Sequence, residues 1–489
     1  MNTETLIGKT NLNFIDGKFE NGVQKTMDIF SPLTGEVIST VPLSGKSELD
    51  KAVASCKKAQ EAWGARTLKE RVQVFFKFRE LLDKHKDELA ALVQLENGKT
   101  IGEAMAEVMK GMELTEFACS LPQMVNDEIQ EVSKGVECRT THFPMGVVAS
   151  ITPFNFPCMV PLWTVPNALA LGNAMIVKPS EQTPLSAGRI AELLKEAGLP
   201  DGVLNIINGD KEIVEAICDH PDISAVSFVG STKVAKIVYA RATSNFKRCV
   251  ALGGAKNHLI VLPDADPGMA SANIAASMAG CAGQRCMAAS AMVAVGDVEH
   301  IVERICDEAR KITAGQNLGS VISKEAKERI ERYIDEAEAA GAKVLVDGRN
   351  ASVAGKEGGY YVGPTVIDQV TPDMAIAKEE VFGPVLAIMR TDDLDEAIRI
   401  ENSSNYGNAS SVFTQNGGTA DYVMDRVSAG MVGVNIGVPV PREPFPFGGW
   451  NESKFGVTDI TGKSSIQFWT KLKKRTSKWS ADAWTNWMS

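Results

Sequence analysis

The sequence has few of the residues that build metal sites. Its 489 residues include five histidines and nine cysteines, and no HExxH pattern occurs. Cys281 and Cys286 are five positions apart, which matches no common zinc-ligand spacing. In a long chain without a visible export signal, cysteines are expected to remain reduced thiols. We therefore predict no metal centre and no disulfide framework.

Long apolar runs and an excess of positive charge are also missing. The most apolar stretch, residues 158–172, is interrupted by Pro161 and Pro166 and is too short to cross a membrane. The opening residues MNTETLIGKTNLNF show neither an export nor a transit pattern. The formal net charge of -10 argues against a nucleic-acid-binding surface. We expect a cytoplasmic protein with neither a membrane nor a nucleic-acid partner.

What is present is an ordinary globular composition in a long chain. Apolar residues make up 44% and charged residues 23% of the sequence, close to the average for soluble proteins. A chain of this length exceeds one compact core and predicts two or three packed units.

The chain changes its pattern near Met145. Before it, possible capping boxes at Ser47–Asp50 and Thr67–Glu70 precede helical apolar spacing, so the first hundred residues are predicted to be mainly helical. After it, short apolar runs are separated by enough residues for crossover helices, which is typical of parallel βαβ units. The runs are GVVASI (146–151), AMIV (174–177), LNII (204–207), AVSFV (225–229) and HLIVL (258–262), then MVAV (292–295), KVLVD (343–347), VLAIM (385–389) and MVGVN (431–435).

These two series predict an α/β fold with two doubly wound parallel sheets. The last segment, SSIQFWTKLKKRTSKW, alternates and resembles an edge strand that needs a partner. We expect it to form a subunit interface.

The strongest chemical signal is AGCAGQRCMAAS (279–290), a run of small residues with Cys286 next to Arg285. Small neighbours let a substrate approach closely, and the cation of Arg285 can favour the reactive thiolate. A buried packing cysteine is the competing interpretation. The local sequence leaves the two about equal.

A second signal is ITPFNFP (151–157), which follows a predicted strand. The side-chain amide of Asn155 can donate to an oxygen that gains negative charge, with the backbone N–H of Cys286 as its partner donor. Asn155 could equally cap the turn between the two prolines.

Two further segments suggest nucleotide contacts. In MIVKPSEQTP (175–184), Lys178 and Glu181 end a strand where ribose hydroxyls are often bound, although the usual GxGxxG pattern is absent and a solvated strand end is possible. In SFVGSTKVA (227–235), Gly230 and Ser231 begin a helix, a position that favours phosphate. Each signal is weak alone.

Taken in order, these segments resemble the aldehyde dehydrogenase superfamily over essentially the whole chain. ALGGAKNH (251–258), KEEVFGPV (378–385) and PFPFGGWNESKFG (444–456) add to the resemblance. It implies that Cys286 is the nucleophile and Asn155 the oxyanion donor. It also implies NAD as cofactor, bound by Phe154, Lys178, Glu181, Gly230, Ser231, Glu380 and Phe382.

The resemblance also divides the chain. It implies an NAD-binding domain of residues 1–121 and 144–252, a catalytic domain of residues 253–463, and oligomerisation segments 122–143 and 464–489. Homodimers or homotetramers are the expected assembly. NAD is expected over NADP because the Glu181 carboxylate would repel a ribose 2'-phosphate.

The sequence differs from the hydrolytic members of the superfamily at one position that determines the acyl acceptor. Hydrolytic members of the superfamily carry Glu where this sequence has Ala251, and that Glu activates the water that releases the acid. A thiol, with a pKa of about 8.5, can attack the acyl group without a base far better than water can. We therefore expect the acyl acceptor to be coenzyme A, with acyl-CoA and NADH as products.

The sequence resembles in particular the methylmalonate-semialdehyde dehydrogenases, which are CoA-acylating and take short acidic aldehydes. The resemblance implies that Arg285 and the residue at position 110 bind the acid group, but the expected second Arg is Lys110 here. Malonate semialdehyde or a sulfonated aldehyde therefore stays open as the substrate. A hydrolytic enzyme with Glu380 as base and a homologue that has lost catalysis are the alternatives.

Overall fold

The computed structural model describes residues 9–10, 12–20 and 25–478 of the chain. The N-terminal part is built from short strands before its helices begin. The strands are β1 (Lys9–Thr10), β2 (Asn13–Ile15), β3 (Lys18–Glu20), β4 (Thr26–Phe30) and β5 (Val37–Pro42). The prediction that the first hundred residues are mainly helical is therefore wrong before residue 46. Strand β2 pairs with β3 across the turn Asp16–Gly17 and with a strand near residue 206. The strands are too short to show a clear alternation, but the Asp-Gly pair is a hairpin signal that the prediction overlooked.

Four helices follow, α1 (Lys46–Ala65), α2 (Leu68–Lys84), α3 (Lys86–Asn97) and α4 (Ile101–Met124). The capping box predicted at Thr67 is confirmed, since Thr67 and Glu70 bond each other reciprocally. The box predicted at Ser47 is wrong. Helix α1 starts after Gly45, whose N–H donates to Glu48 at 2.9 Å.

The first large sheet has the order β22-β12-β11-β8-β9-β10-β2-β3. Its five central strands are parallel, and antiparallel strands close both edges. The strands are β8 (Val147–Ile151), β9 (Ala174–Lys178), β10 (Leu204–Ile206), β11 (Ile223–Val229), β12 (Arg248–Leu252) and β22 (Lys454–Phe455). The crossover helices are α5 (Met159–Ala170), α6 (Leu185–Glu196), α7 (Lys211–Asp219) and α8 (Thr232–Ser244).

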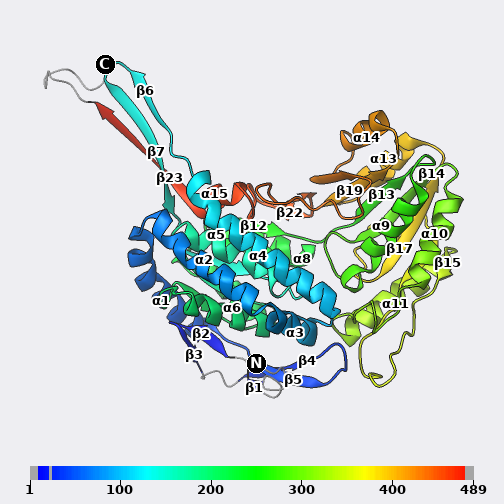
Figure 1. Ribbon diagram of the computed structural model, residues 1–489, viewed down its shortest axis with the longest axis horizontal. Coiled ribbons are helices and arrows are strands. Elements are labelled where there is room, and N and C mark those ends of the chain that lie inside the picture. The colour runs from blue at the N-terminus through cyan, green and yellow to red at the C-terminus, as the bar shows by residue number, and fades with distance from the viewer. Residues whose placement is uncertain (1–8, 11, 21–24, 479–489) are drawn as a thin grey trace.

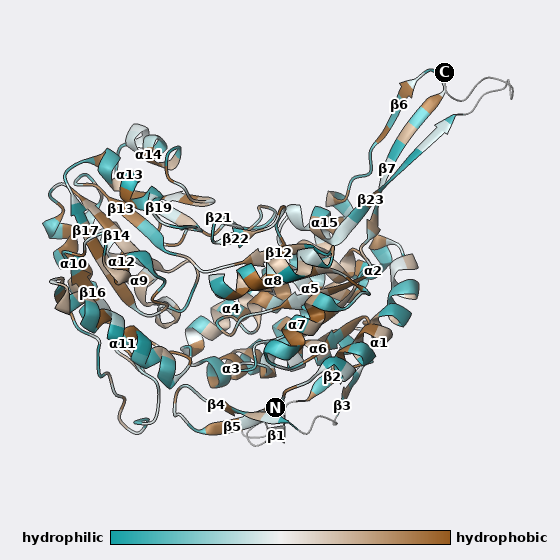
Figure 2. Ribbon diagram, turned by 180° about the vertical axis from the view of Figure 1, so that it is seen from behind, coloured by the Kyte–Doolittle hydropathy of each residue, from teal (hydrophilic) through white to brown (hydrophobic). Residues whose placement is uncertain are grey.

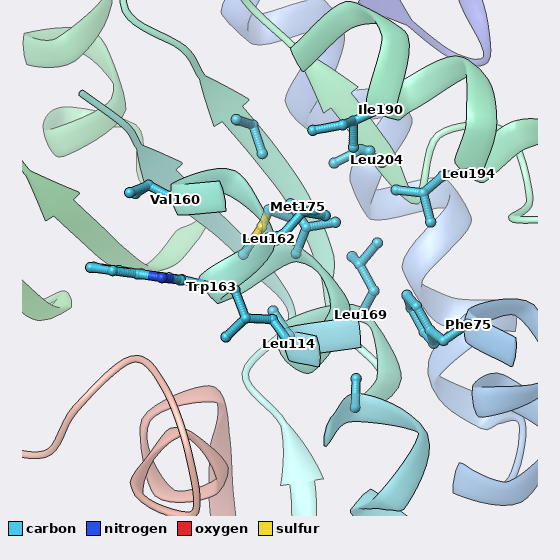
Figure 3. Packing of buried hydrophobic residues seen from close by; sticks show 14 of the residues in the cluster. Phe75, Leu114, Val160, Leu162, Trp163, Leu169, Met175, Ile190, Leu194 and Leu204 are labelled. Carbon is cyan, nitrogen blue, oxygen red and sulfur yellow. The ribbon is translucent and has the colours of Figure 1, made fainter. Parts of the chain in front are cut away.

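Helices cover both faces of this sheet. Alternate residues of β9 belong to different apolar clusters: Met175 and Val177 pack with α2, α4, α5 and α6, whereas Ala174 and Ile176 pack with α1, α7 and α8. Figure 3 shows Met175 among Leu162, Leu169 and other side chains of the first cluster. Burial of both faces explains why these strands read as short continuous apolar runs.

The second sheet has the order β15-β16-β17-β14-β13-β19-β20 and is parallel apart from the β15–β16 pair. Its strands are β13 (Asn257–Val261), β14 (Ala289–Val295), β15 (Lys343–Val346), β16 (Thr365–Asp368), β17 (Val385–Thr391), β19 (Ala409–Phe413) and β20 (Met431–Val434). Helices α9 (Pro267–Ala279), α10 (Glu299–Arg310), α11 (Lys324–Ala339), α12 (Ala375–Lys378), α13 (Leu394–Asn402) and α14 (Gly417–Met424) accompany them. The small pair β18 (Tyr406–Gly407) and β21 (Trp450–Asn451) lies apart.

A three-stranded arm projects from this body (Figure 1). Strand β7 (Val136–Pro144) lies between β6 (Ile129–Ser133) and β23 (Thr470–Lys478), and both pairings are antiparallel. The predicted terminal strand thus has its partner within the chain. It begins after helix α15 (Ser464–Trp469), and residues 479–489 of the predicted segment lie outside the described residues.

The predicted fold class, two doubly wound α/β sheets with an arm, is confirmed. Apolar residues concentrate along the strands and the inner helix faces (Figure 2). In the described part of the chain, no helix combines the length and apolarity needed to span a bilayer. The domain boundaries stay a prediction, and β22, which falls in the predicted second domain, pairs with β12 of the first sheet.

Candidate active site

A cavity of about 1210 Å³ lies at the carboxyl ends of strands β8 to β12, where it also meets loops of the second sheet. This is the edge at which open parallel sheets bind ligands. All eleven site residues predicted from the sequence line it, together with further residues of both halves. They are Lys110, Phe154, Asn155, Lys178, Glu181, Gly230, Ser231, Arg285, Cys286, Glu380 and Phe382.

Cys286 lies on the loop that leads into β14. Its carbonyl accepts hydrogen bonds from the side chains of Asn257 at 2.7 Å and Asn408 at 2.9 Å, which fixes the backbone at the thiol. Burial, together with the negative charge of Glu380, raises the pKa of the Cys286 thiol to about 12. The charge of Arg285 lowers this pKa, as expected from the sequence, but burial outweighs it.

Asn155 reaches the same loop from the first sheet. It follows β8, is almost fully buried, and its Nδ2 donates to the carbonyl of Gln284 at 3.0 Å. An amide nitrogen carries two hydrogens, so one remains for an oxygen bound beside Cys286. The fold therefore brings the predicted nucleophile and the predicted oxyanion donor together.

Three of the residues predicted to bind NAD, Phe154, Glu380 and Phe382, line the cavity together. The rings of Phe154 and Phe382 meet edge to face, with centroids 5.8 Å apart. Glu380 lies beside them and accepts the N–H of Ala255 at 3.0 Å. Burial raises the pKa of Glu380 to about 7.

The predicted nucleotide contacts lie at neighbouring strand ends. Lys178, almost fully buried at the end of β9, binds the carboxylate of Glu181 at 2.6 Å. Ser231 precedes helix α8 without a side-chain cap bond, next to Gly230. A helix start with free N–H groups favours a phosphate.

A model of the aldehyde dehydrogenase family matches residues 19–475. The chain belongs to the aldehyde dehydrogenase family. The predicted family is thus confirmed over nearly the whole sequence.

Its relatives narrow the comparison. The chain is 45% identical to malonate-semialdehyde dehydrogenase 1 of Geobacillus thermodenitrificans (strain NG80-2), over 96% of this chain and 98% of the relative. It is 44% identical to malonate-semialdehyde dehydrogenase of Halalkalibacterium halodurans, with the same coverage. A solved structure from Sinorhizobium meliloti 1021, assigned as a methylmalonate-semialdehyde dehydrogenase complexed with NAD, aligns with a TM-score of 0.95 at 42% identity, covering 98% of this chain and 99% of the other.

Ala251 lies on strand β12 of this aldehyde dehydrogenase. It is fully buried, and its register neighbours are Phe228 on β11 and Phe455 on β22. The methyl group belongs to an apolar cluster and can accept no proton.

The two cations predicted to bind the substrate differ in their surroundings. Arg285 donates to the carbonyls of Ala276 and Ser277 at 3.0 and 2.8 Å, and no carboxylate of the described residues pairs with it. Lys110 instead binds Glu443 at 2.8 Å and Glu113 at 3.0 Å. Its charge is balanced by these two carboxylates, and the contact of Lys110 with the substrate stays a prediction.

Sequence reasoning missed the residues that hold these loops. Lys99 Nζ donates to the carbonyl of Asn155 and pairs with buried Glu107. Thr100 and Glu103 form a capping box at the start of α4, and the spacing rule applied at Thr67 would have found it. That Glu103 also reaches Cys281, across 178 positions, has no sequence signal.

Proposed function

We propose that this aldehyde dehydrogenase oxidises a short acidic aldehyde with NAD and transfers the acyl group from Cys286 to coenzyme A, giving acyl-CoA and NADH. The observation that carries the proposal is Ala251. The family position of the water-activating carboxylate holds a methyl group packed inside an apolar cluster.

The residues that line the cavity suit NAD in their chemistry. Lys178 and Glu181 would bind the adenosine ribose, the start of α8 at Ser231 the pyrophosphate, and Glu380 with Phe382 the nicotinamide side. NAD would supply the hydride acceptor. The relative solved with NAD, at 42% identity, supports this assignment.

The chain's own groups would then act on the aldehyde. The sulfur of Cys286 adds to the carbonyl carbon, and the oxygen takes hydrogen bonds from Asn155 Nδ2 and the Cys286 N–H. Oxidation leaves a thioester on Cys286. The sulfur of coenzyme A attacks the acyl carbon, the bond to Cys286 breaks, and the acyl group leaves as acyl-CoA.

The substrate is proposed from the charges at the cavity. Arg285, next to Cys286 in the chain, lines the cavity and has no carboxylate partner among the described residues, and its planar head suits a carboxylate. Relatives at 44–45% identity bear the name malonate-semialdehyde dehydrogenase. A three-carbon semialdehyde is therefore the first candidate, ahead of its methylated and sulfonated analogues.

A hydrolytic reaction is the competing proposal, because Glu380 has a pKa near 7 and lies close to Cys286. Its Oε1, however, accepts the N–H of Ala255. This bond favours the ionised form, but it also orients the group toward the Gly254–Ala255 backbone.

The test is an NADH-formation screen with purified enzyme. Malonate semialdehyde, its methylated analogue, a sulfonated aldehyde and propanal are compared with and without coenzyme A. We expect steady turnover of an acidic aldehyde only with coenzyme A, and one burst of NADH per site without it. Sustained NADH production without any thiol would overturn the acylating proposal.

The proposals on the oligomeric state and on the cellular location rest on the sequence. We propose that the arm of β6, β7 and β23 joins subunits into dimers or tetramers, because its outer edges carry no further strand among the described residues. The cytoplasmic location stays a prediction.

A further inference from the structure

The loop that carries Cys286 is preceded by an unusual turn. Cys281, Ala282 and Gly283 all have left-handed backbones, with φ of 53°, 51° and 68°. Glycine adopts this conformation freely, but cysteine and alanine do not. Strain of this kind persists only where the surroundings enforce it, and it often marks a functional site.

The carboxylate of Glu103 contacts this turn directly. Its Oε1 accepts the N–H of Cys281 at 2.6 Å. Its Oε2 accepts the N–H of Thr100 at 3.0 Å and the Thr100 hydroxyl at 2.9 Å. One half-buried side chain therefore joins the first turn of α4 to the turn that leads to Cys286.

Helix α2 begins with a capping box that lacks this additional contact. The capping box at the start of α2 has the same design: Glu70 Oε2 accepts the N–H and hydroxyl of Thr67 at 2.7 and 2.8 Å. Among the described residues, Glu70 accepts no bond from a distant loop. The bond to Cys281 is what Glu103 adds.

The same segment also fixes the oxyanion donor. Lys99, one residue before the α4 cap, donates to the carbonyl of Asn155. Glu107, one turn further along α4, pairs with Lys99 and accepts the N–H of Cys158 at 2.8 Å. The beginning of α4 thus holds the Asn155 loop and the Cys286 loop in one frame.

We propose that Glu103 is a positioning residue for Cys286. It holds the left-handed turn so that the sulfur and the Cys286 N–H keep their places relative to Asn155. Small displacements of reacting groups can cost about 100-fold in rate. The inference rests on the proposed role of Cys286 as the nucleophile.

The experiment compares Glu103→Ala with Glu70→Ala in the full-length enzyme. Both lose a capping carboxylate, and Glu103→Ala also loses the bond to Cys281, so we expect a decrease in Tm for both variants and the larger one for Glu103→Ala. The NADH burst without coenzyme A counts the competent active sites, and kcat is calculated per competent site. On this basis kcat should fall at least about tenfold in Glu103→Ala and stay unchanged in Glu70→Ala. The KM values for aldehyde and NAD should stay within about threefold, because the binding groups are untouched.

A kcat for Glu103→Ala within twofold of the wild type would overturn the inference, as would an equal kcat loss in Glu70→Ala. If Glu103→Ala does not fold, Glu103→Asp takes its place, because it keeps the charge on the helix but is one methylene too short to span both contacts. Cys286→Ala is measured in parallel. Activity in that variant would refute the nucleophile assignment, whereas an inactive Cys286→Ala with a normal Glu103 variant refutes only the positioning role.

Discussion

Replacing Glu443 by Gln should improve the use of acidic aldehydes. Glu443 and Glu113 both contact the ammonium of Lys110, at 2.8 and 3.0 Å, at the edge of the cavity. Two carboxylates around one lysine leave no net positive charge at Lys110, and Arg442, which also lines the cavity, lies 4.0 Å from Glu113. Gln keeps the size of Glu443 and removes one negative charge.

The size of the effect follows from Coulomb's law. The side chains of Lys110 and Glu443 are 22% and 14% exposed, so the medium is intermediate between water and a protein interior. For a substrate carboxylate about 6 Å away and an effective dielectric constant of about 40–80, removing one charge lowers the energy by about 0.7–1.4 kcal/mol. We therefore expect kcat/KM for malonate semialdehyde to rise about three- to tenfold.

The assay compares malonate semialdehyde with propanal at saturating NAD and coenzyme A. Propanal has no charge, so its kcat/KM should stay constant. Glu113→Gln is the matched control: its side chain is 45% exposed, so screening by water and salt should leave a smaller effect. An equal gain in kcat/KM for both aldehydes would refute the electrostatic explanation. So would a gain that high salt does not reduce, or no gain at all.

Three further outcomes are expected. Asn155→Ala should lower kcat about 100- to 1000-fold with little change in the KM for NAD, measured by steady-state kinetics, because one oxyanion donor is lost. Glu181→Gln should raise the NADP/NAD ratio of kcat/KM, because the carboxylate that repels a 2'-phosphate disappears while Lys178 stays; an unchanged ratio would count against its place at the ribose. Glu401 is buried, accepts the N–H of Ser428 at 2.9 Å, and has its pKa raised by burial from 4.5 to about 7. A raised carboxyl pKa means that the folded state binds more protons, so its stability is full below about pH 4.5 and is lost as the pH rises to about 7. Glu401→Gln should therefore match the wild type at pH 4.5 and exceed it by up to about 3 kcal/mol at pH 8 in urea unfolding; equal stability at both pH values would contradict this.

The sequence predicted the parts of the fold that depend on local pattern. Buried parallel strands read as apolar runs, so β8, β9 and β11 lie where the runs predicted them. Strand β12, with the sequence RCVAL, begins with a charge and was missed. The short N-terminal strands were missed although β2 and β3 form a hairpin across Asp16–Gly17, and an Asp-Gly pair is a local hairpin signal.

The site was predictable as a set of residues but not as a set of contacts. The order of the motifs predicted that Cys286 and Asn155 share one site, and both residues line the cavity. Glu113, three positions after Lys110 on the same helix, could have been predicted as its partner, but Glu443 lies 333 positions away and has no sequence signal. Burial of the Cys286 thiol is likewise a property of the folded surroundings, so its raised pKa could not be anticipated from its neighbour Arg285.

Burial connects the two halves of the proposed reaction. It raises the pKa of Cys286 to about 12, which disfavours the free thiolate until a positive charge or a base acts on it. The later thioester is protected for a second reason: attacking water would need a base, and the buried position 251 offers only a methyl group. A coenzyme A thiol has a pKa of about 8.5 and brings a few per cent of its own thiolate at neutral pH. The thioester on Cys286 should therefore hydrolyse slowly, and its acyl group should be transferred when the thiol of coenzyme A reaches it.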